Sequence, residues 1–236
     1  MKPLRRHQLV SLDEFGWYRI LAAASSSPSL SHQQSPASAA QALDCLEHWA
    51  VHRWPLVVTR QPADLPAGMS DTPLALGLSA PARWGHHPIG VSASAHAVVR
   101  QDEFPLVADL VPSLPVAAWA GWWTLCEHLA RLGVAARVYG SYGWQHLTGL
   151  EYVHPHSDLD LLLDVATLAQ ADRACALLQG AELGPLRIDG ELAFEDGASV
   201  AWREWLRFRS GQTDRVLVKR IAGMTLEGAT AWVEMT

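Results

Sequence analysis

Apolar residues in the second half of the chain recur first at helical spacing and then in short strand-like runs. Trp122, Cys126 and Leu129, with Trp119 and Trp123, predict a helix that ends at Gly133. The expected elements are helices over 115–132 and 166–179, strands over 134–139, 159–163 and 216–219, and a hairpin of 188–194 and 199–206 turned at Glu195-Asp196-Gly197. This order predicts an α+β domain with a mixed sheet and flanking helices.

The first half has a weaker pattern. It predicts a helix over 39–51 and strands over 56–59 and 74–78, and the small, polar stretch 22–40 is typical of an exposed connection. Three prolines punctuate 104–115, so we predict a domain boundary there, with a smaller α/β domain over 1–112 and the α+β domain over 113–236.

Composition narrows the class of protein. The chain has 236 residues, is 49% hydrophobic and 18% charged, and carries a net charge of −6. Such a chain is globular, and its charge argues against nucleic acid as the main partner. It contains no apolar run of about 20 residues that could cross a bilayer, and no apolar core of signal-peptide length follows its basic start, so we expect no signal peptide. Three widely spaced cysteines are typical of reduced, buried thiols, so we expect a cytoplasmic protein.

The strand over 159–163 is preceded by acidic residues. Side chains of alternate strand residues point the same way, so Asp158 and Asp160 project together while Leu159 and Leu161 face the core. Two neighbouring carboxylates repel each other unless a cation lies between them, and hard oxygen ligands favour Mg²⁺ or Mn²⁺. The strand therefore predicts a metal site for phosphoryl chemistry.

Gly140 and Ser141 stand where the preceding strand ends. A glycine lets the backbone approach phosphate oxygens, and free N–H groups with a serine hydroxyl can hold terminal phosphates. Each feature alone is common in turns and strand edges. Their combination, in this order and on these elements, predicts a nucleotidyltransferase site.

Other residues complete the candidate site. A third carboxylate usually acts as metal ligand or base; Asp189 and Glu191 both qualify, and we favour Asp189. Lys219 could bind a phosphate or lie at a solvated strand edge. Arg203, next to Trp202, could clamp a nucleotide, although a strand burying alternate aromatic residues would have the same pattern.

The histidines suggest a metallohydrolase instead. His154 and His156, followed by Asp158, partly match a His-x-His-x-Asp-His metal signature, but position 159 is leucine and no histidine follows His156. Too few ligands remain for that chemistry. A serine hydrolase is also disfavoured, because Ser141 lacks the full Gly-x-Ser-x-Gly elbow.

The motif Val138-Tyr139-Gly140-Ser141, followed by Ser157-Asp158-Leu159-Asp160, resembles that of DNA polymerase β-type nucleotidyltransferases. Within that superfamily, the chain resembles the phosphoribosyl-dephospho-CoA transferases of malonate decarboxylase, also called holo-[acyl-carrier-protein] synthases. The segments that carry this narrower resemblance are Arg6-His7, Trp54-Pro55-Leu56-Val57-Val58, Tyr139-Gly140-Ser141-Tyr142-Gly143-Trp144, Asp189-Gly190-Glu191 and Ala201-Trp202-Arg203-Glu204-Trp205.

The resemblance implies a reaction. A serine of the apo acyl-carrier subunit would attack the α-phosphorus of 2′-(5-triphosphoribosyl)-3′-dephospho-CoA and release pyrophosphate. Asp158 and Asp160 would bind Mg²⁺, and Gly140 and Ser141 would hold the triphosphate. The sixteen residues 142–157 exceed the usual superfamily spacing and are a candidate substrate loop, with Trp144 and His146 near the nucleotide. An ATP-using nucleotidyltransferase and a non-catalytic binding module remain alternatives.

Overall fold

The chain folds into two compact units, each described by itself. The computed structural model describes residues 3–26, 36–62 and 73–235. One unit runs up to Glu103 and includes Leu150–Tyr152; the other comprises Phe104–Gly149 and the chain from Val153 onward. Residues 104–112, which the sequence boundary gives to the first domain, fold with the second unit. There Leu110 is fully buried in the core, and the Trp122 indole donates to the Val107 carbonyl at 3.0 Å.

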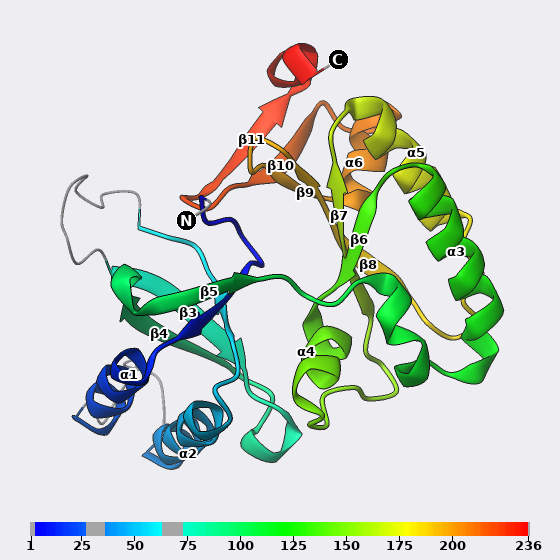
Figure 1. The fold of residues 1–236 in the computed structure, drawn as a ribbon. Coiled ribbons are helices and arrows are strands. Elements are labelled where there is room, and N and C mark those ends of the chain that lie inside the picture. Colours follow the sequence, from blue (N-terminus) through cyan, green and yellow to red (C-terminus); the bar gives the residue numbers. More distant parts are fainter. Residues whose placement is uncertain (1–2, 27–35, 63–72, 236) are drawn as a thin grey trace. The chain divides into compact units, whose positions relative to one another are not determined.

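The first unit pairs a five-stranded sheet with two helices (Figure 1). Its elements are β1 (Leu9–Leu12), α1 (Glu14–Ser26), α2 (Pro36–His52), β2 (Leu56–Val58), β3 (Pro73–Ser79), β4 (Pro88–Ser94) and β5 (Val98–Asp102). The sheet order is β4-β3-β2-β1-β5, and every neighbouring pair is antiparallel. The unit is therefore α+β, and the α/β prediction for it is wrong. Both helices fall between β1 and its antiparallel neighbour β2, so neither forms a parallel crossover.

The three elements predicted for the first unit are present, but the prediction lacked β1, α1, β4 and β5. The helix expected over 39–51 is α2, which starts earlier, at Pro36, a residue that suits the first helical turn. The strands expected over 56–59 and 74–78 are β2 and β3. Of the expected connection over 22–40, residues 27–35 lie outside the described part. Its first residues belong instead to α1, which is anchored by the buried side chains of Trp17 and Ile20 and continues through an alanine run.

The second unit is built on a six-stranded mixed sheet. Its elements are η3 (Val107–Ser113), η4 (Val116–Ala118), α3 (Trp119–Arg131), β6 (Ala135–Val138), α4 (Gly140–Thr148), β7 (Leu159–Val165), α5 (Leu168–Gln179), β8 (Ile188–Phe194), β9 (Ser199–Ala201), α6 (Trp202–Arg209), β10 (Arg215–Lys219), β11 (Met224–Gly228) and η5 (Ala229–Met235). The order is β11-β10-β9-β8-β7-β6, in which β7 and β8 are parallel and the other pairs are antiparallel. The predicted mixed sheet of the second domain is confirmed.

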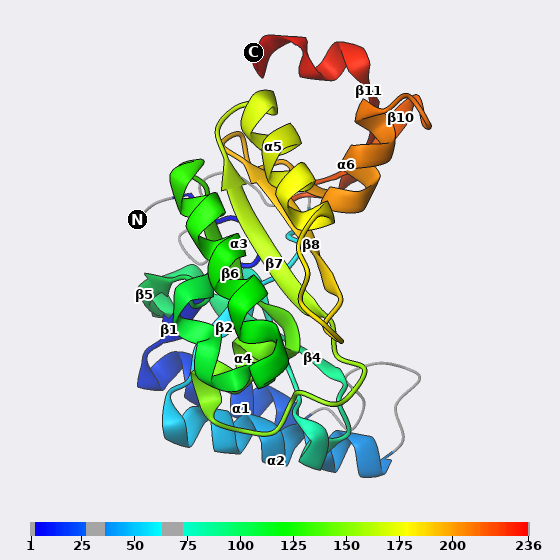
Figure 2. The ribbon, with the colours of Figure 1, turned by 90° about the vertical axis from the view of Figure 1, so that its right-hand side faces the viewer.

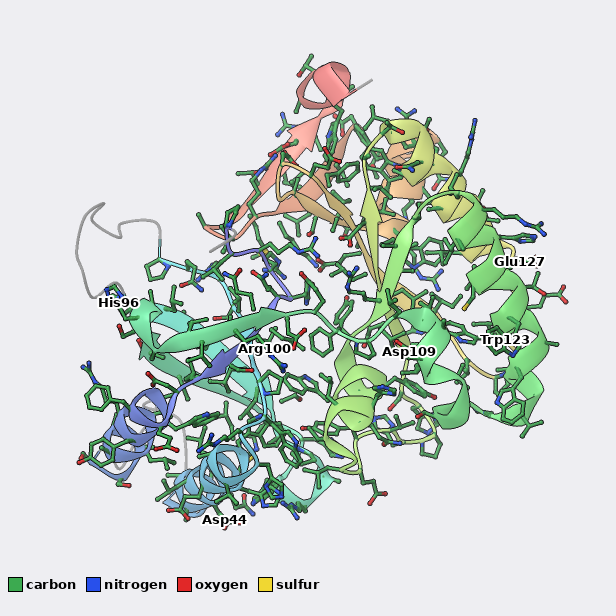
Figure 3. All side chains as sticks on the ribbon, in the orientation of Figure 1. Asp44, His96, Arg100, Asp109, Trp123 and Glu127 are labelled. Atoms are coloured by element: carbon green, nitrogen blue, oxygen red, sulfur yellow. The ribbon has the colours of Figure 1, made fainter. Side chains whose placement is uncertain are left out.

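Helices α3, α5 and α6 pack on one face of this sheet (Figure 2). Leu159, Leu161 and Leu163 of β7 point into that layer and are fully buried in the core. The helix predicted over 115–132 is confirmed as α3, but its tryptophans differ: Trp122 is buried, whereas Trp123 is 53% exposed on the outer face, beside Glu127 (Figure 3). The packing side of the sheet is apolar, so polar residues of β7 and β8 lie on the other side.

The prediction of a strand over 199–206, the second strand of the hairpin, is wrong from Trp202 onward. Its turn is confirmed, since the Phe194 amide donates to the Ala198 carbonyl at 2.8 Å, but strand β9 ends at Ala201 and helix α6 begins at Trp202. Trp202 and Trp205 stand three residues apart, so a helix buries both on one face, whereas a strand would direct them to opposite faces. The Trp205 indole also donates to Asp172 of α5 at 2.9 Å.

The cysteines match the sequence prediction. Cys45, Cys126 and Cys175 are free and buried. Burial raises the pKa of the Cys126 thiol to about 11, so this group stays protonated near neutral pH. None of the described helices has the length and hydrophobicity to span a bilayer.

Candidate active site

The predicted acidic residues meet at the N-terminal ends of two neighbouring inner strands of the second sheet, β7 and β8. Asp158 immediately precedes β7, and Asp160 is its second residue. Because β7 and β8 are parallel, Asp160 lies directly opposite Asp189 in the register. Paired residues of neighbouring strands share a face, so the carboxylates of Asp160 and Asp189 project from the side opposite the helical layer.

Gly140 brings the second predicted motif against these carboxylates. It has a φ of +61° and opens α4 directly after β6. A Cβ at this position would lie 1.9 Å from Oδ2 of Asp160, so only glycine lets the chain pass so close. The Tyr139 amide donates to the Asp160 carbonyl at 3.0 Å and fixes this approach.

The first turn of α4 supplies hydrogen-bond donors next to the acidic residues. Tyr139, which caps the helix, offers no side-chain bond to the free N–H groups of that turn, and Ser141 is its second residue. Gly143 lets the helix pack closely, because a Cβ there would lie 2.4 Å from the Val138 carbonyl. The N–H groups and the Ser141 hydroxyl can bind phosphate oxygens, and they lie beside two carboxylates that can bind a cation.

The three aspartates differ in their electrostatic environment. The pKa of Asp160 is raised to about 7, first by burial and then by the charges of Asp189 and Asp158. The pKa of Asp158 is lowered, chiefly by hydrogen bonds from the Arg187 guanidinium. Asp160 is thus a crowded carboxylate whose charged form calls for a cation.

Arg187 is a site residue that the sequence reasoning missed. Its Nε donates to Oδ1 of Asp158 at 2.7 Å, and its Nη2 contacts Oδ2 of the same carboxylate. The available signal was position: Arg187 stands two residues before Asp189, where the parallel register brings it level with Asp158.

Glu191 and Lys219 form a buried ion pair. Lys219 Nζ lies 2.7 Å from Oε1 of Glu191, which is 5% exposed. Glu191 shares the face of Asp189, but its charge is neutralised by this lysine. The Asp189 carboxylate accepts a hydrogen bond from the Gly190 amide at 2.9 Å. The phosphate-binding role predicted for Lys219 stays a prediction that must compete with this pairing.

We expect Lys219→Met to lower the free energy of unfolding by about 2 kcal/mol, because it removes the cation that balances the buried Glu191 carboxylate. Urea denaturation at pH 7.5 would measure the loss. The double variant Lys219→Met/Glu191→Gln should recover most of it, since no unpaired charge remains. An undiminished stability of the single variant, together with weaker triphosphate binding, would assign Lys219 to the substrate.

Two other predicted groups are engaged in structure. The Arg203 guanidinium lies 4.2 Å from the centroid of the Trp202 ring and donates to the Ile188 carbonyl at 2.8 Å. Trp202 itself is buried, so its ring is not presented to a nucleotide. Arg203 is exposed beside the start of β8, and its substrate-binding role stays a prediction.

The candidate substrate loop over 142–157 is only partly a loop. Residues up to Thr148 belong to α4, and Trp144 is buried, with its ring edge-on to Phe104 at 5.3 Å. The Trp144 ring therefore packs among buried side chains, and its expected place near the nucleotide stays a prediction. His146 is exposed on α4, and His154 and His156 are exposed in the segment that follows.

Within the described residues, no group of three or more His, Cys, Asp and Glu side chains is arranged to hold a metal ion. Both oxygens of Asp158 are engaged by Arg187. The donor set nevertheless fits a hard divalent cation: carboxylate oxygens only, crowded around a half-buried Asp160. The charge of Arg187 partly balances that of the cluster.

Fold and site together describe a two-domain α+β protein. Its second domain gathers carboxylates at the N-terminal ends of two parallel strands of a mixed sheet, next to the N-terminus of a helix. Residues 5–104 and 105–229 match the models of the phosphoribosyl-dephospho-CoA transferase MdcG N-terminal and C-terminal domains. The chain belongs to this family, and it is a phosphoribosyl-dephospho-CoA transferase.

Relatives of the same name support the assignment along the chain. The phosphoribosyl-dephospho-CoA transferase of Bradyrhizobium diazoefficiens is 36% identical over 95% of this chain and 90% of its own length. That of Xanthomonas campestris is 33% identical over 79% and 84%, and that of Pseudomonas aeruginosa is 36% identical over 70% and 74%. No solved structure gives a significant match.

Proposed function

We propose that this enzyme attaches the 2′-(5-phosphoribosyl)-3′-dephospho-CoA group to a serine of the apo acyl-carrier subunit of malonate decarboxylase. The donor is the 5-triphosphoribosyl precursor. The serine oxygen forms a bond to the α-phosphorus, the bond from that phosphorus to the bridging oxygen breaks, and pyrophosphate leaves. Family membership supports the donor, and the carboxylates beside the α4 N-terminus support the chemistry.

The observation that carries this proposal is the contact between the two motifs, Gly140 against Asp160. The contact places the N–H groups at the start of α4, which can bind phosphate oxygens, next to the carboxylate of Asp160. This is the arrangement expected from the resemblance to DNA polymerase β-type nucleotidyltransferases. Asp158, Asp160 and Asp189 would hold Mg²⁺ or Mn²⁺. Such an ion, when bound, neutralises the triphosphate and lowers the barrier to displacement.

Chain residues supply positioning and proton transfer. Ser141 and the N–H groups of the first α4 turn hold the terminal phosphates, which leave as pyrophosphate. Of the two candidates for the third carboxylate, Asp189 is the better supported, because it faces Asp160 in the register while Glu191 is paired with Lys219. Asp189 then accepts the serine proton as the nucleophile attacks.

The direct experiment offers the enzyme two donors with the same apo carrier. Incubation with the triphosphoribosyl precursor and Mg²⁺ should release pyrophosphate and add the mass of the prosthetic group to the carrier. Pyrophosphate release with ATP instead of the precursor would favour the general nucleotidyltransferase alternative. Absence of transfer from both donors would leave the non-catalytic module.

Gly140→Ala should lower transfer about a hundredfold and raise the KM for the triphosphate donor, because the new methyl group would collide with the Asp160 carboxylate. Gly149→Ala is the matched control. Gly149 has a similar φ of +70°, but a Cβ there meets nothing within 4 Å. It should cost about 1 kcal/mol of stability and leave the kinetics unchanged; equal kinetic losses in both variants would contradict the role of the Gly140 contact.

A further inference from the structure

We propose that Arg187 is a triphosphate-binding residue that exchanges Asp158 for the donor's phosphates when the metal site fills. This inference rests on the proposed function, because it concerns the same site. In the structure the guanidinium pairs with Asp158; with metal and donor bound, it would turn to the phosphate oxygens.

The backbone of Arg187 is held by a hydrogen bond to β7, whereas most of its side chain is exposed to solvent. The Leu159 amide donates to the Arg187 carbonyl at 2.9 Å, so the residue is tied to the start of β7. The Arg187 side chain is 67% exposed, and that of its partner Asp158 is 24% exposed. Solvent around the exposed guanidinium screens the pair, so a second anion of higher charge can compete with Asp158 for it.

The pairing competes with metal binding. Both Asp158 oxygens accept bonds from one guanidinium, through Nε and Nη2. These bonds take one lone pair of each oxygen and balance the negative charge of the carboxylate, so Asp158 is a weaker ligand for a cation while Arg187 is bound to it. A metal ion at the carboxylates then repels the guanidinium and completes its displacement.

Phosphate is the suitable new partner for the released group. The planar fork of a guanidinium binds carboxylate and phosphate with the same bidentate geometry, so the exchange preserves both hydrogen bonds. The charges of Asp158, Asp189 and Asp160 all act on the Arg187 guanidinium, so Arg187 stands beside the carboxylates to which the proposed function assigns the metal and the triphosphate. Arg203, by contrast, is held by the Ile188 carbonyl and stacks on Trp202.

Titration calorimetry of the full chain with two probes, Mn²⁺ alone and inorganic tripolyphosphate in saturating Mn²⁺, tests the exchange. Arg187→Gln should bind Mn²⁺ several-fold more tightly, because the competing cation is gone. It should bind tripolyphosphate roughly tenfold to a hundredfold more weakly, because charge-assisted hydrogen bonds are lost. Arg187→Lys, which keeps the charge without the fork, should be intermediate for both probes.

Arg207→Gln removes one positive charge from an exposed position on α6 and controls for net charge. Opposite shifts in Arg187→Gln, absent from Arg207→Gln, support the exchange. Unchanged tripolyphosphate affinity, or weaker Mn²⁺ binding, would overturn it, because Arg187 would then only support Asp158. Neither probe requires transfer, so opposite shifts in a protein that transfers nothing would retain this inference while rejecting the proposed reaction.

Discussion

Asp160→Asn is expected to lower prosthetic-group transfer about a thousandfold or more, because metal-assisted stabilisation of the transition-state charge is worth several kcal/mol. Asp160 is the carboxylate that lies against Gly140 and opposite Asp189, so both halves of the site depend on it. The measurements are kcat/KM for pyrophosphate release in saturating Mg²⁺ and the affinity for Mn²⁺ by calorimetry. Both should fall.

Asp164→Asn is the matched control for this loss. Asp164 lies on the same strand and the same face, but it pairs with Arg137 at 2.7 Å, away from Gly140. Its replacement should reduce stability modestly and leave Mn²⁺ affinity unchanged. Transfer that survives Asp160→Asn at more than a tenth of the original rate would mean that the reaction occurs elsewhere.

The centre of the site could be predicted because it depends on local geometry. Alternation along a strand puts Asp158 and Asp160 on the same side whatever the rest of the chain does. A glycine after a strand indicates a close approach, and the structure identifies the approaching atom as an Asp160 oxygen. Because Gly140 and Ser141 follow one predicted strand and Asp158 and Asp160 begin the next, the sequence alone assigned both motifs to one site.

Pairings between distant segments could not be read in the same way. Arg187 binds Asp158 only because β7 and β8 are parallel and in this register. The engagement of Glu191 by Lys219 depends on the order of three neighbouring strands, which no local pattern specifies. The choice between Asp189 and Glu191 therefore needed the fold.

Short elements were misread where two periodicities compete. The segment 199–206 has aromatic residues that suit a strand if only its composition is considered, yet the spacing of Trp202 and Trp205 suits a helix. The indole bond from Trp205 to Asp172 and the contact of the Arg209 guanidinium with the same carboxylate, at 2.7 Å, attach α6 to α5. Tertiary contacts thus decided the structure.

The second large effect concerns stability, and its sign follows from the raised pKa of Asp160. The folded-state pKa of Asp160 is about 7, well above the ordinary value of an aspartate, so the folded protein keeps this proton to higher pH than the unfolded chain does. The contribution of Asp160 to the free energy of unfolding therefore falls as the pH rises from about 4 to about 7, and this decrease is complete above the folded-state pKa. Three pKa units correspond to at most about 4 kcal/mol.

Asp160→Asn should remove this loss. In the presence of EDTA, urea denaturation should give similar stabilities for the two proteins at pH 4.5, whereas at pH 8 the variant should be the more stable by several kcal/mol. Taking the difference between the two proteins cancels the titration of groups that they share and leaves the contribution of Asp160.

Adding Mg²⁺ at pH 8 should reverse the order of stability. The cation binds the folded wild-type protein and stabilises it, whereas the variant lacks the central ligand and gains little. A difference between variant and wild type that stays constant from pH 4.5 to pH 8 would mean that the carboxylates do not crowd one another. The same charge repulsion that destabilises the metal-free protein would then no longer be available to favour binding of the cation and its triphosphate.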